Sequence, residues 1–127
     1  MHAPHTYDYA IVRVVPRVER GEFINVGAIL SCHAQRQLAA RIELDAARLL
    51  ALAPGIDVDF VRDALMAIPR ICAGGSGAGA LGALTLRERF HWLTAPRSTL
   101  VQTSPVHTGR CVDLDVALEH LLDRMVR

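Results

Sequence analysis

Three strand-like segments lie within the first 44 residues, and the links between them are too short to hold a crossover helix. Residues 7–15 (YDYAIVRVV) are rich in β-branched and aromatic side chains. Residues 22–32 (EFINVGAILSC) and 37–44 (QLAARIEL) each follow after one turn. Because consecutive strands with short links pair antiparallel, we predict a three-strand antiparallel meander. Gly27, in the middle of the second strand, indicates a bulge or a close backbone approach.

Helical spacing of the apolar residues begins after the third strand. Asp45 is a favourable N-cap for a helix over residues 46–53. Asp57 caps a second helix, which Pro69 is expected to kink or end, because proline lacks the N–H that a helix interior requires.

The rest of the chain predicts one more strand and two more helices. Residues 73–83 (AGGSGAGALGA) are rich in glycine and predict a flexible loop. A capping box at Thr85 and Glu88 opens a third helix. Residues 98–103 predict a short fourth strand, and a final helix starts at one of two aspartates, Asp113 or Asp115.

Composition fits one folded domain. The chain has 127 residues, of which 51% are hydrophobic and 21% charged, and these fractions are typical of globular proteins. We therefore expect residues 1–127 to form a single α+β domain. It would combine the three-strand meander and the short fourth strand with about four helices packed against them.

Charge and cysteine content exclude several functions. The net charge is +1, which disfavours nucleic-acid binding. All basic residues are arginines, so mechanisms that need a lysine are excluded. Three dispersed cysteines without a CxxC pair indicate free thiols and a cytoplasmic location. We expect no membrane segment, because no apolar run approaches the ~18 residues of a span and the N-terminus lacks a signal-peptide pattern.

The usual catalytic and metal-binding patterns are weak in this sequence. The glycine-rich stretch follows a helix and lacks the lysine of a phosphate-binding loop. The histidines and cysteines have no spacing typical of a zinc site, so neither a metal nor a cofactor is expected. Ser104 and His107 make a poor hydrolase pair, because neither lies on a strained turn.

Two polar stretches stand out where an apolar core does not require polar residues. The first runs from the first turn into the second strand, and the second surrounds the fourth strand. Arginine side chains bind anions bidentately, so the second stretch could form an anion or nucleotide pocket, or only a polar strand edge with its own loop bonds. The candidate ligand- or partner-binding residues are Arg20, Glu22, Asn25, Arg97, Ser98, Gln102, His107 and Thr108.

The same two stretches carry a family resemblance. YDYAIVRVVPRVERGEFINVGAIL and RFHWLTAPRSTLVQTSPVHTG resemble the hallmark segments of the DUF3037 family, which comprises short bacterial proteins with no assigned function. The resemblance brings no catalytic residue. Because members often lie beside genes for HipA-like kinase proteins, it implies at most a partner or accessory role. The residues that match the family motifs are Arg20, Gly21, Glu22, Asn25, Gly27, Arg97, Ser98 and His107.

Two functional hypotheses follow. The first is a non-enzymatic accessory or protein-interaction module, which would use a sheet edge or an exposed apolar patch to form a homodimer or to bind a protein such as a HipA-like kinase. The alternative is a small-molecule or nucleotide-binding enzyme. It requires Arg20, Glu22, Arg97 and His107 to meet in one cleft within hydrogen-bonding reach.

Overall fold

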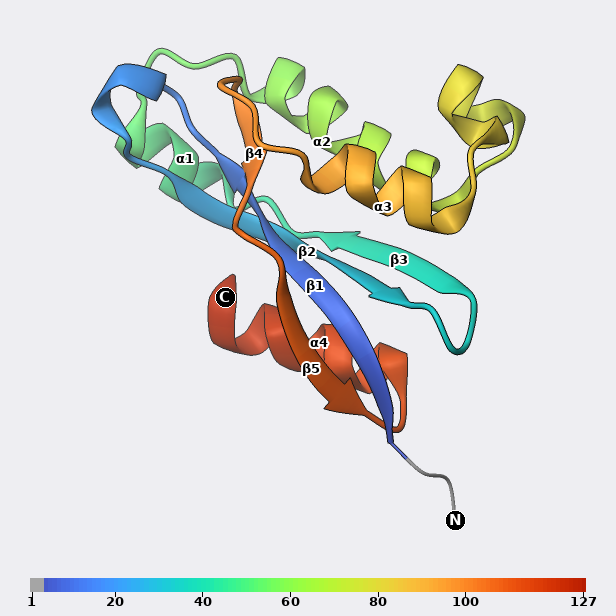
Figure 1. Cartoon of the computed structure of the whole chain (residues 1–127). Helices are drawn as coiled ribbons and strands as arrows, with labels where there is room; N and C mark the ends of the chain where they lie inside the picture. The colour runs from blue at the N-terminus through green and yellow to red at the C-terminus, as the bar shows by residue number, and fades with distance from the viewer. Residues whose placement is uncertain (1–3) are drawn as a thin grey trace.

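The computed structural model describes residues 4–127 and arranges them as a β-sheet with helices on both faces (Figure 1). In this part of the chain five strands pair antiparallel, and four α-helices and two short 3₁₀ segments connect or follow them. The predicted α+β class is therefore confirmed. None of these helices is long and apolar enough to cross a membrane.

The sheet is built around the first strand. Strands β1 (His5–Val14), β2 (Ile24–Cys32) and β3 (Gln37–Ile42) are antiparallel neighbours in chain order, which confirms the predicted meander. Strands β4 (Val101–Thr103) and β5 (His107–Cys111) both pair with the other side of β1. The strand order is β3-β2-β1-β4, with β5 following β4 along β1.

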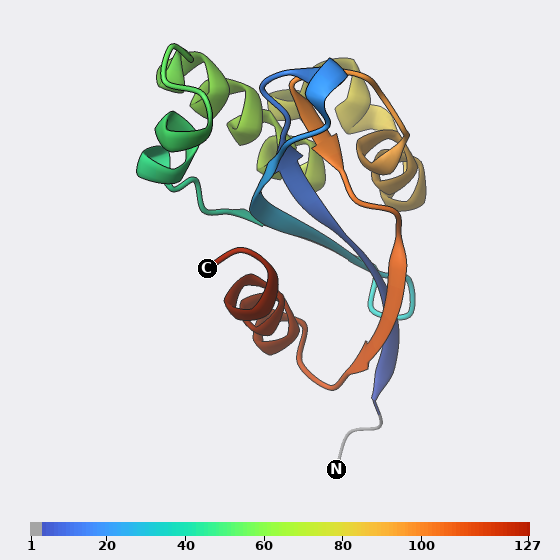
Figure 2. The same ribbon diagram turned by 90° about the vertical axis from the view of Figure 1, so that its left-hand side faces the viewer.

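Helices cover the two faces of the sheet unequally (Figure 2). Helices α1 (Ala46–Leu52), α2 (Val58–Ala73) and α3 (Leu86–Thr94) lie on one face, and α4 (Leu114–Met125) lies alone on the other. Each face has its own apolar core. The half of the second face beside β4 and β5 carries fewer buried residues than the half under α4.

Strand β1 contributes alternate residues to the two cores. Val12 and Val14 are buried against α2 and α3, whereas Tyr7 and Ile11 are buried against α4. Both faces of this strand are therefore covered. Burial of each such side chain contributes roughly 1.5–3 kcal/mol, so β1 anchors both layers.

A β-bulge in β2 changes the alternation of that strand. Val12 lies opposite Gly27, but the next residue, Arg13, lies opposite Asn25, so Val26 is the extra residue. The extra residue turns Asn25 to the face of the sheet that carries Arg13. This is the same face on which α4 packs.

Gly27 lies in a place without room for a side chain. A Cβ atom there would lie 2.6 Å from the carbonyl oxygen of Arg41 and 2.7 Å from Cδ1 of Ile42, on the neighbouring strand. The sequence indicated a bulge or a close approach at this glycine, and the structure has both. The bulge also sends Val26 and Ala28 to different cores, although residues two apart in a regular strand share a face.

Two short strands, β4 and β5, form the edge of the sheet beside β1. The predicted strand over 98–103 is shortened to β4, and a further strand that the sequence did not predict, β5, pairs with β1 after it. Ser104 spans the break: its N–H donates to the Ile11 carbonyl at 2.8 Å, and its Oγ accepts from the Ile11 N–H at 2.9 Å. Pro105 follows and has no N–H to offer to another strand.

The helix starts agree with the sequence. Asp45, Asp57 and Asp113 each cap a helix by accepting from a backbone N–H in its first turn. Thr85 and Glu88 form the predicted capping box of α3. Each of these caps satisfies donors that the first turn of a helix leaves free.

Helix α2 does not end at Pro69, which was one of the two outcomes expected for this proline. It runs on to Ala73, and Ile71 and Cys72 in this last turn are buried. Burial of these side chains offsets the hydrogen bond that proline removes.

The glycine-rich stretch contains η2 (Ser76–Ala83), two short 3₁₀ turns that meet at Gly79, where a loop was predicted. Ala78 and Leu81 pack against the core under α2, so this segment is in contact with the rest of the fold.

Candidate functional site

The β1–β2 loop carries the first polar stretch and includes a 3₁₀ turn, η1 (Val18–Arg20). Gly21 ends this turn with φ of 70°, a left-handed conformation that favours glycine. The turn brings Arg20 and Glu22 together, and Arg20 Nε donates to Glu22 Oε1 in an exposed ion pair. Local contacts therefore define the conformation of the loop.

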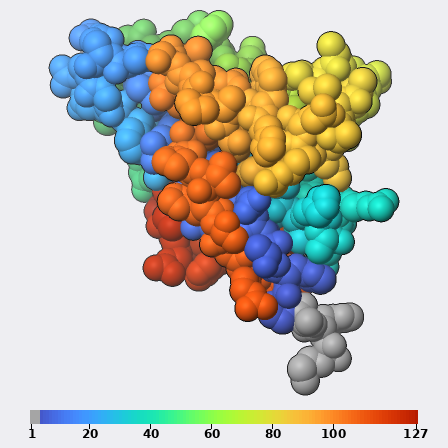
Figure 3. Space-filling view, in the orientation of Figure 1, coloured from blue at the N-terminus to red at the C-terminus, as the bar shows by residue number. Residues whose placement is uncertain are grey.

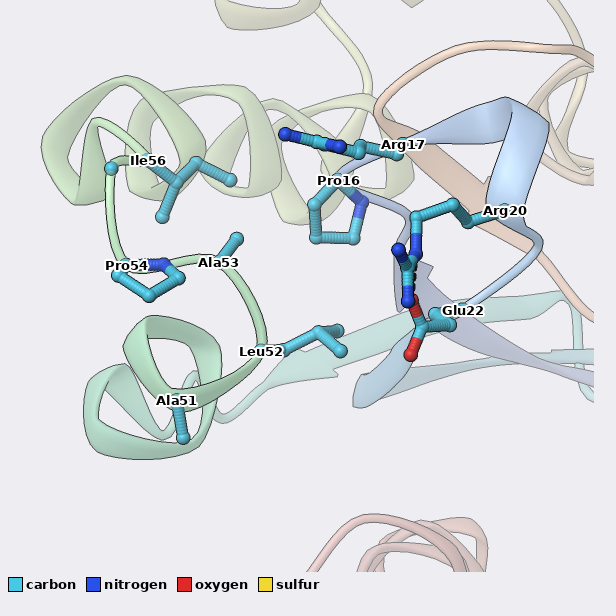
Figure 4. A pocket seen from close by; sticks show the side chains of 10 residues that line it. Pro16, Arg17, Arg20, Glu22, Ala51, Leu52, Ala53, Pro54 and Ile56 are labelled. Carbon is cyan, nitrogen blue, oxygen red and sulfur yellow. Dashed lines mark hydrogen bonds and ion pairs between the residues drawn. The ribbon is translucent and has the colours of Figure 1, made fainter.

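A pocket of about 670 Å³ lies between this loop and the connection from α1 to α2 (Figure 4). The side chain of Arg17 extends across it towards Ile56, and Leu52 points from the opposite wall towards the Arg20–Glu22 pair. The pocket thus has a charged wall facing an apolar one. Its lining consists of Pro16, Arg17, Arg20, Glu22 and residues 51–56.

One positive charge in this pocket is not balanced. The hydrogen bond to Glu22 and the charge of that carboxylate raise the pKa of Arg20 above its ordinary value, so this pair is satisfied. Arg17 takes part in none of the ion pairs formed within residues 4–127. A ligand that carries an anionic group next to an apolar group would complement both walls of the pocket.

A second polar group lies on the α4 side of the sheet. Arg13 has Asn25 of β2 on one side and Gln102 of β4 on the other. The ring of Phe23 stacks on its guanidinium, with 4.1 Å between Arg13 Cζ and the ring centroid. Asn25 Nδ2 donates to the Met125 carbonyl at 2.9 Å. Arg13 Nε and Asn25 Oδ1 are buried and have no hydrogen-bond partner in the described residues.

The second polar stretch is engaged mainly in local contacts after α3. The guanidinium of Arg97 stacks on the Trp92 ring at 4.6 Å and donates to the Trp92 carbonyl, which places a cation at the C-terminal end of the helix. Ser98 is exposed in the loop that follows the helix. Gln102 Nε2 donates to the Thr99 carbonyl at 2.8 Å in the same turn.

His107 and Thr108 connect β5 to β1. The ring of His107 lies 5.6 Å from that of Tyr9, directly across the strand pair. Thr108 Oγ1 donates to Asp8 Oδ1, and Arg87 Nη1 donates to the other oxygen of Asp8, both at 3.0 Å. These contacts tie β5 and α3 to the first strand.

The eight candidate residues do not form one cleft. The space-filling view shows the β1–β2 loop at one corner and the start of β4 near it, with β5 further down the sheet edge (Figure 3). His107 lies opposite Tyr9, and β1 rises about 3.4 Å per residue, which places this histidine roughly 20 Å from Pro16. Of the candidates, only Arg20 and Glu22 line the same pocket.

The serine and cysteine side chains that could act as nucleophiles are either hydrogen-bonded within the fold or not activated. Ser104 Oγ accepts from the Ile11 N–H and donates to the Pro105 carbonyl at 2.9 Å, so it completes the sheet edge. Burial raises the pKa of the Cys72 thiol to about 12, and it also raises the pKa of Cys111. A reactive cysteine needs the opposite shift. Residues 4–127 contain no group of three His, Cys, Asp or Glu side chains placed to hold a metal ion.

Sequence reasoning missed two arginines of this region. Neither Arg13 nor Arg17 was among the candidate residues. A usable signal existed for Arg13, because a charged residue in a strand that is otherwise apolar needs a partner. The partner wall of the Arg17 pocket, residues 51–56, is distant in sequence and gave no signal.

The comparisons with known proteins identify a family. A family model described as "Protein of unknown function (DUF3037)" matches residues 9–126. No curated protein and no solved structure matches the chain.

Proposed function

The chain belongs to the DUF3037 family, whose function is unknown, and we propose that it is a non-enzymatic protein-interaction module. The partner docks at the pocket between the β1–β2 loop and residues 51–56. One observation carries this proposal: the side chain of Arg17 extends over an apolar wall and forms no ion pair within the described residues.

The chemistry of the pocket defines the partner segment. Leu52 and Ile56 offer apolar contact area, and the guanidinium of Arg17 offers paired donors for a carboxylate. An acidic segment with an apolar side chain next to its carboxylate would fill both parts. The lining favours binding over acid–base chemistry, because its one carboxylate, Glu22, is held by Arg20.

The kinase-like partner implied by the family resemblance is one candidate for such a segment. The alternative, an enzyme with an Arg/Glu/His cleft, has less support, because Arg97 and His107 are engaged outside this pocket.

Affinity capture from the native host tests the proposal. The tagged domain, its Arg17→Glu variant and a matched Arg110→Glu variant are compared by quantitative mass spectrometry. Arg110 is also exposed but lies on β5, outside this pocket. We expect one protein, with a HipA-like kinase as the first candidate, to be captured by the wild type and by Arg110→Glu. Its recovery with Arg17→Glu should fall at least tenfold.

Unchanged melting temperatures of both variants establish that the fold is intact. Equal capture by all three proteins would contradict docking at this pocket. Absence of any specific capture would contradict the interaction module itself.

A further inference from the structure

The two outer edges of the sheet are built differently. The edge formed by β4 and β5 is interrupted at Ser104 and Pro105, and the proline has no N–H for a further strand. The opposite edge is β3, which runs for 6 residues in continuous register with β2 and contains neither proline nor glycine (Figure 1). Natural sheets normally protect such an edge, because its free backbone groups can pair with another chain.

The outward backbone groups of β3 have no strand to pair with. In an antiparallel ladder every second residue bonds to the neighbouring strand, and the Glu43 N–H donates to the Val26 carbonyl at 2.7 Å. The odd-numbered residues of β3 therefore bond towards β2. The even-numbered residues direct their N–H and C=O groups away from it, and no other strand of residues 4–127 lies on that side. These residues are Leu38, Ala40 and Ile42.

A groove of about 730 Å³ lies against the first half of this edge. One wall is formed by the end of α2 and the start of α3, including Cys72 and Leu86, and the other by the start of α4, including Val112. Because these helices lie on opposite faces of the sheet, Leu38 and Ala39 lie between the two walls. The volume is within the range of about 300–1,000 Å³ typical of ligand sites, so the groove has room for a segment of chain beside β3.

The α4 wall of the groove is acidic. Asp113 and Asp115 are exposed there, and neither forms an ion pair within the described residues. Ala39 lies on the same face of the sheet, and its side chain is small. Of the arginines that line the groove, Arg89 is buried and donates to two carbonyl groups, and Arg36 belongs to the turn before β3. A long basic side chain opposite Ala39 would therefore meet the carboxylates.

We infer that β3 binds an extended segment of a partner protein as an antiparallel sixth strand, with a basic residue opposite Ala39 and apolar residues on both sides of it. Backbone hydrogen bonds to Leu38 and Ala40 supply affinity, and the side chains on the two faces supply specificity. The apolar residues continue the surface of Leu38, Ala40 and Ile42, which pack against the core under α2 and remain partly exposed. The groove shares no residue with the Arg17 pocket, so this inference is independent of the proposed function.

Titration with short peptides tests this site in the full-length ¹⁵N-labelled protein. The probe is acetyl-Thr-Val-Arg-Val-Thr-amide. One control peptide has glutamate in place of the arginine, and the other is methylated on both valine nitrogens, which removes the N–H groups that would pair with β3. We expect saturable shifts of the Leu38, Ala40 and Ile42 amide signals with the arginine peptide, at least threefold weaker binding of the glutamate peptide, and no saturation with the methylated peptide.

A reversal of charge on the α4 wall gives an independent test. Asp115→Arg should bind the glutamate peptide more tightly than the arginine peptide. The matched control is Asp59→Arg in the first turn of α2, outside the groove, which should keep the wild-type order. Both variants lose one carboxylate from the first turn of a helix, so their melting temperatures should be close to each other.

Three outcomes would overturn the inference. These are no response of the three β3 amides to the arginine peptide, equal binding of the methylated peptide, and the same order of peptide affinities in Asp115→Arg as in the wild type. Shifts of these amides on dilution of the protein alone would assign the edge to a second copy of the chain and contradict a partner strand.

Discussion

Gly27 is the residue on which the geometry of β2 depends most directly. A Cβ atom at this position would lie 2.6 Å from the backbone oxygen of Arg41, and a backbone atom in a sheet cannot move aside as a flexible side chain does. We predict that Gly27→Ala lowers the free energy of unfolding by about 1–3 kcal/mol, because the β2–β3 pairing must open to admit the methyl group. Urea unfolding measures this change.

Gly55 provides the matched control. It lies in the connection after α1, where an added Cβ would meet no atom within 4 Å. Gly55→Ala should therefore leave the stability unchanged or raise it slightly, since alanine restricts the unfolded chain. Equal losses in the two variants would mean that the close contact at Gly27 is not the cause.

At the scale of single residues, sequence reasoning succeeded where one residue type had one physical explanation. Gly27 in a strand and the helix caps are of this kind. It failed where a role depends on a partner distant in the chain. Asn25 was a candidate binding residue, but its amide nitrogen donates to the Met125 carbonyl in α4. Arg97 was considered for an anion pocket, but its donors are used at the end of its own helix.

The junction of α2, η2 and α3 depends on a buried arginine. Arg89 is 7% exposed, and its guanidinium donates to the Leu84 carbonyl at 2.7 Å and to the Cys72 carbonyl at 3.4 Å. It therefore joins the last turn of α2 to the segment that precedes α3. Gly74 leaves space for it, because a Cβ there would lie 2.9 Å from Arg89 Nη1.

We predict that Arg89→Lys lowers the free energy of unfolding by about 1–3 kcal/mol. An ammonium group cannot reproduce the fork of donors that reaches two carbonyl groups, so one of these remains unsatisfied. The matched control is Arg62→Lys on the exposed side of α2, where the ion pair with Asp59 tolerates either cation and the change should stay within about 0.5 kcal/mol. Equal stability of Arg89→Lys and wild type would show that this junction does not need the guanidinium.

At the scale of elements, the periodicity of apolar residues predicted the meander and the helices. It missed β5, because HTGRC has no apolar alternation and joins the sheet through backbone pairing beside Tyr7 and Tyr9. It also left open whether α2 would end at Pro69; the helix continues to Ala73, where the tertiary burial of Ile71 stabilises a last turn that local sequence does not predict.

In the whole molecule, the α4 layer is joined to the sheet by a network of ion pairs. Arg127 pairs with Glu43 next to β3 and with Glu119 and Asp123 of α4, and Arg41 of β3 also pairs with Glu119. Because these pairs are partly exposed, each one alone adds little to the free energy of unfolding. Together they form a connected group that spans two layers of the fold.

We predict that this network makes the stability of the fold depend on pH in the acidic range. The hydrogen bond from Arg127 lowers the pKa of Glu43 from 4.5 in the folded state. The stabilisation is therefore fully present above the unfolded pKa and is lost as the pH falls through the lower, folded value. We expect the Tm of the wild type to fall more steeply below pH 4.5 than that of Arg127→Gln. Parallel pH profiles of the two proteins would contradict a role for this pair.

The central claim is that a partner docks at the pocket formed by the β1–β2 loop and residues 51–56. It is tested most directly by ¹H–¹⁵N spectra of the labelled domain with and without the captured partner. The account predicts that the changed signals cluster at residues 16–22 and 51–56 and that Arg17→Glu abolishes them. Changes confined to β5 and the outer surface of α4, with those residues unaffected, would contradict it.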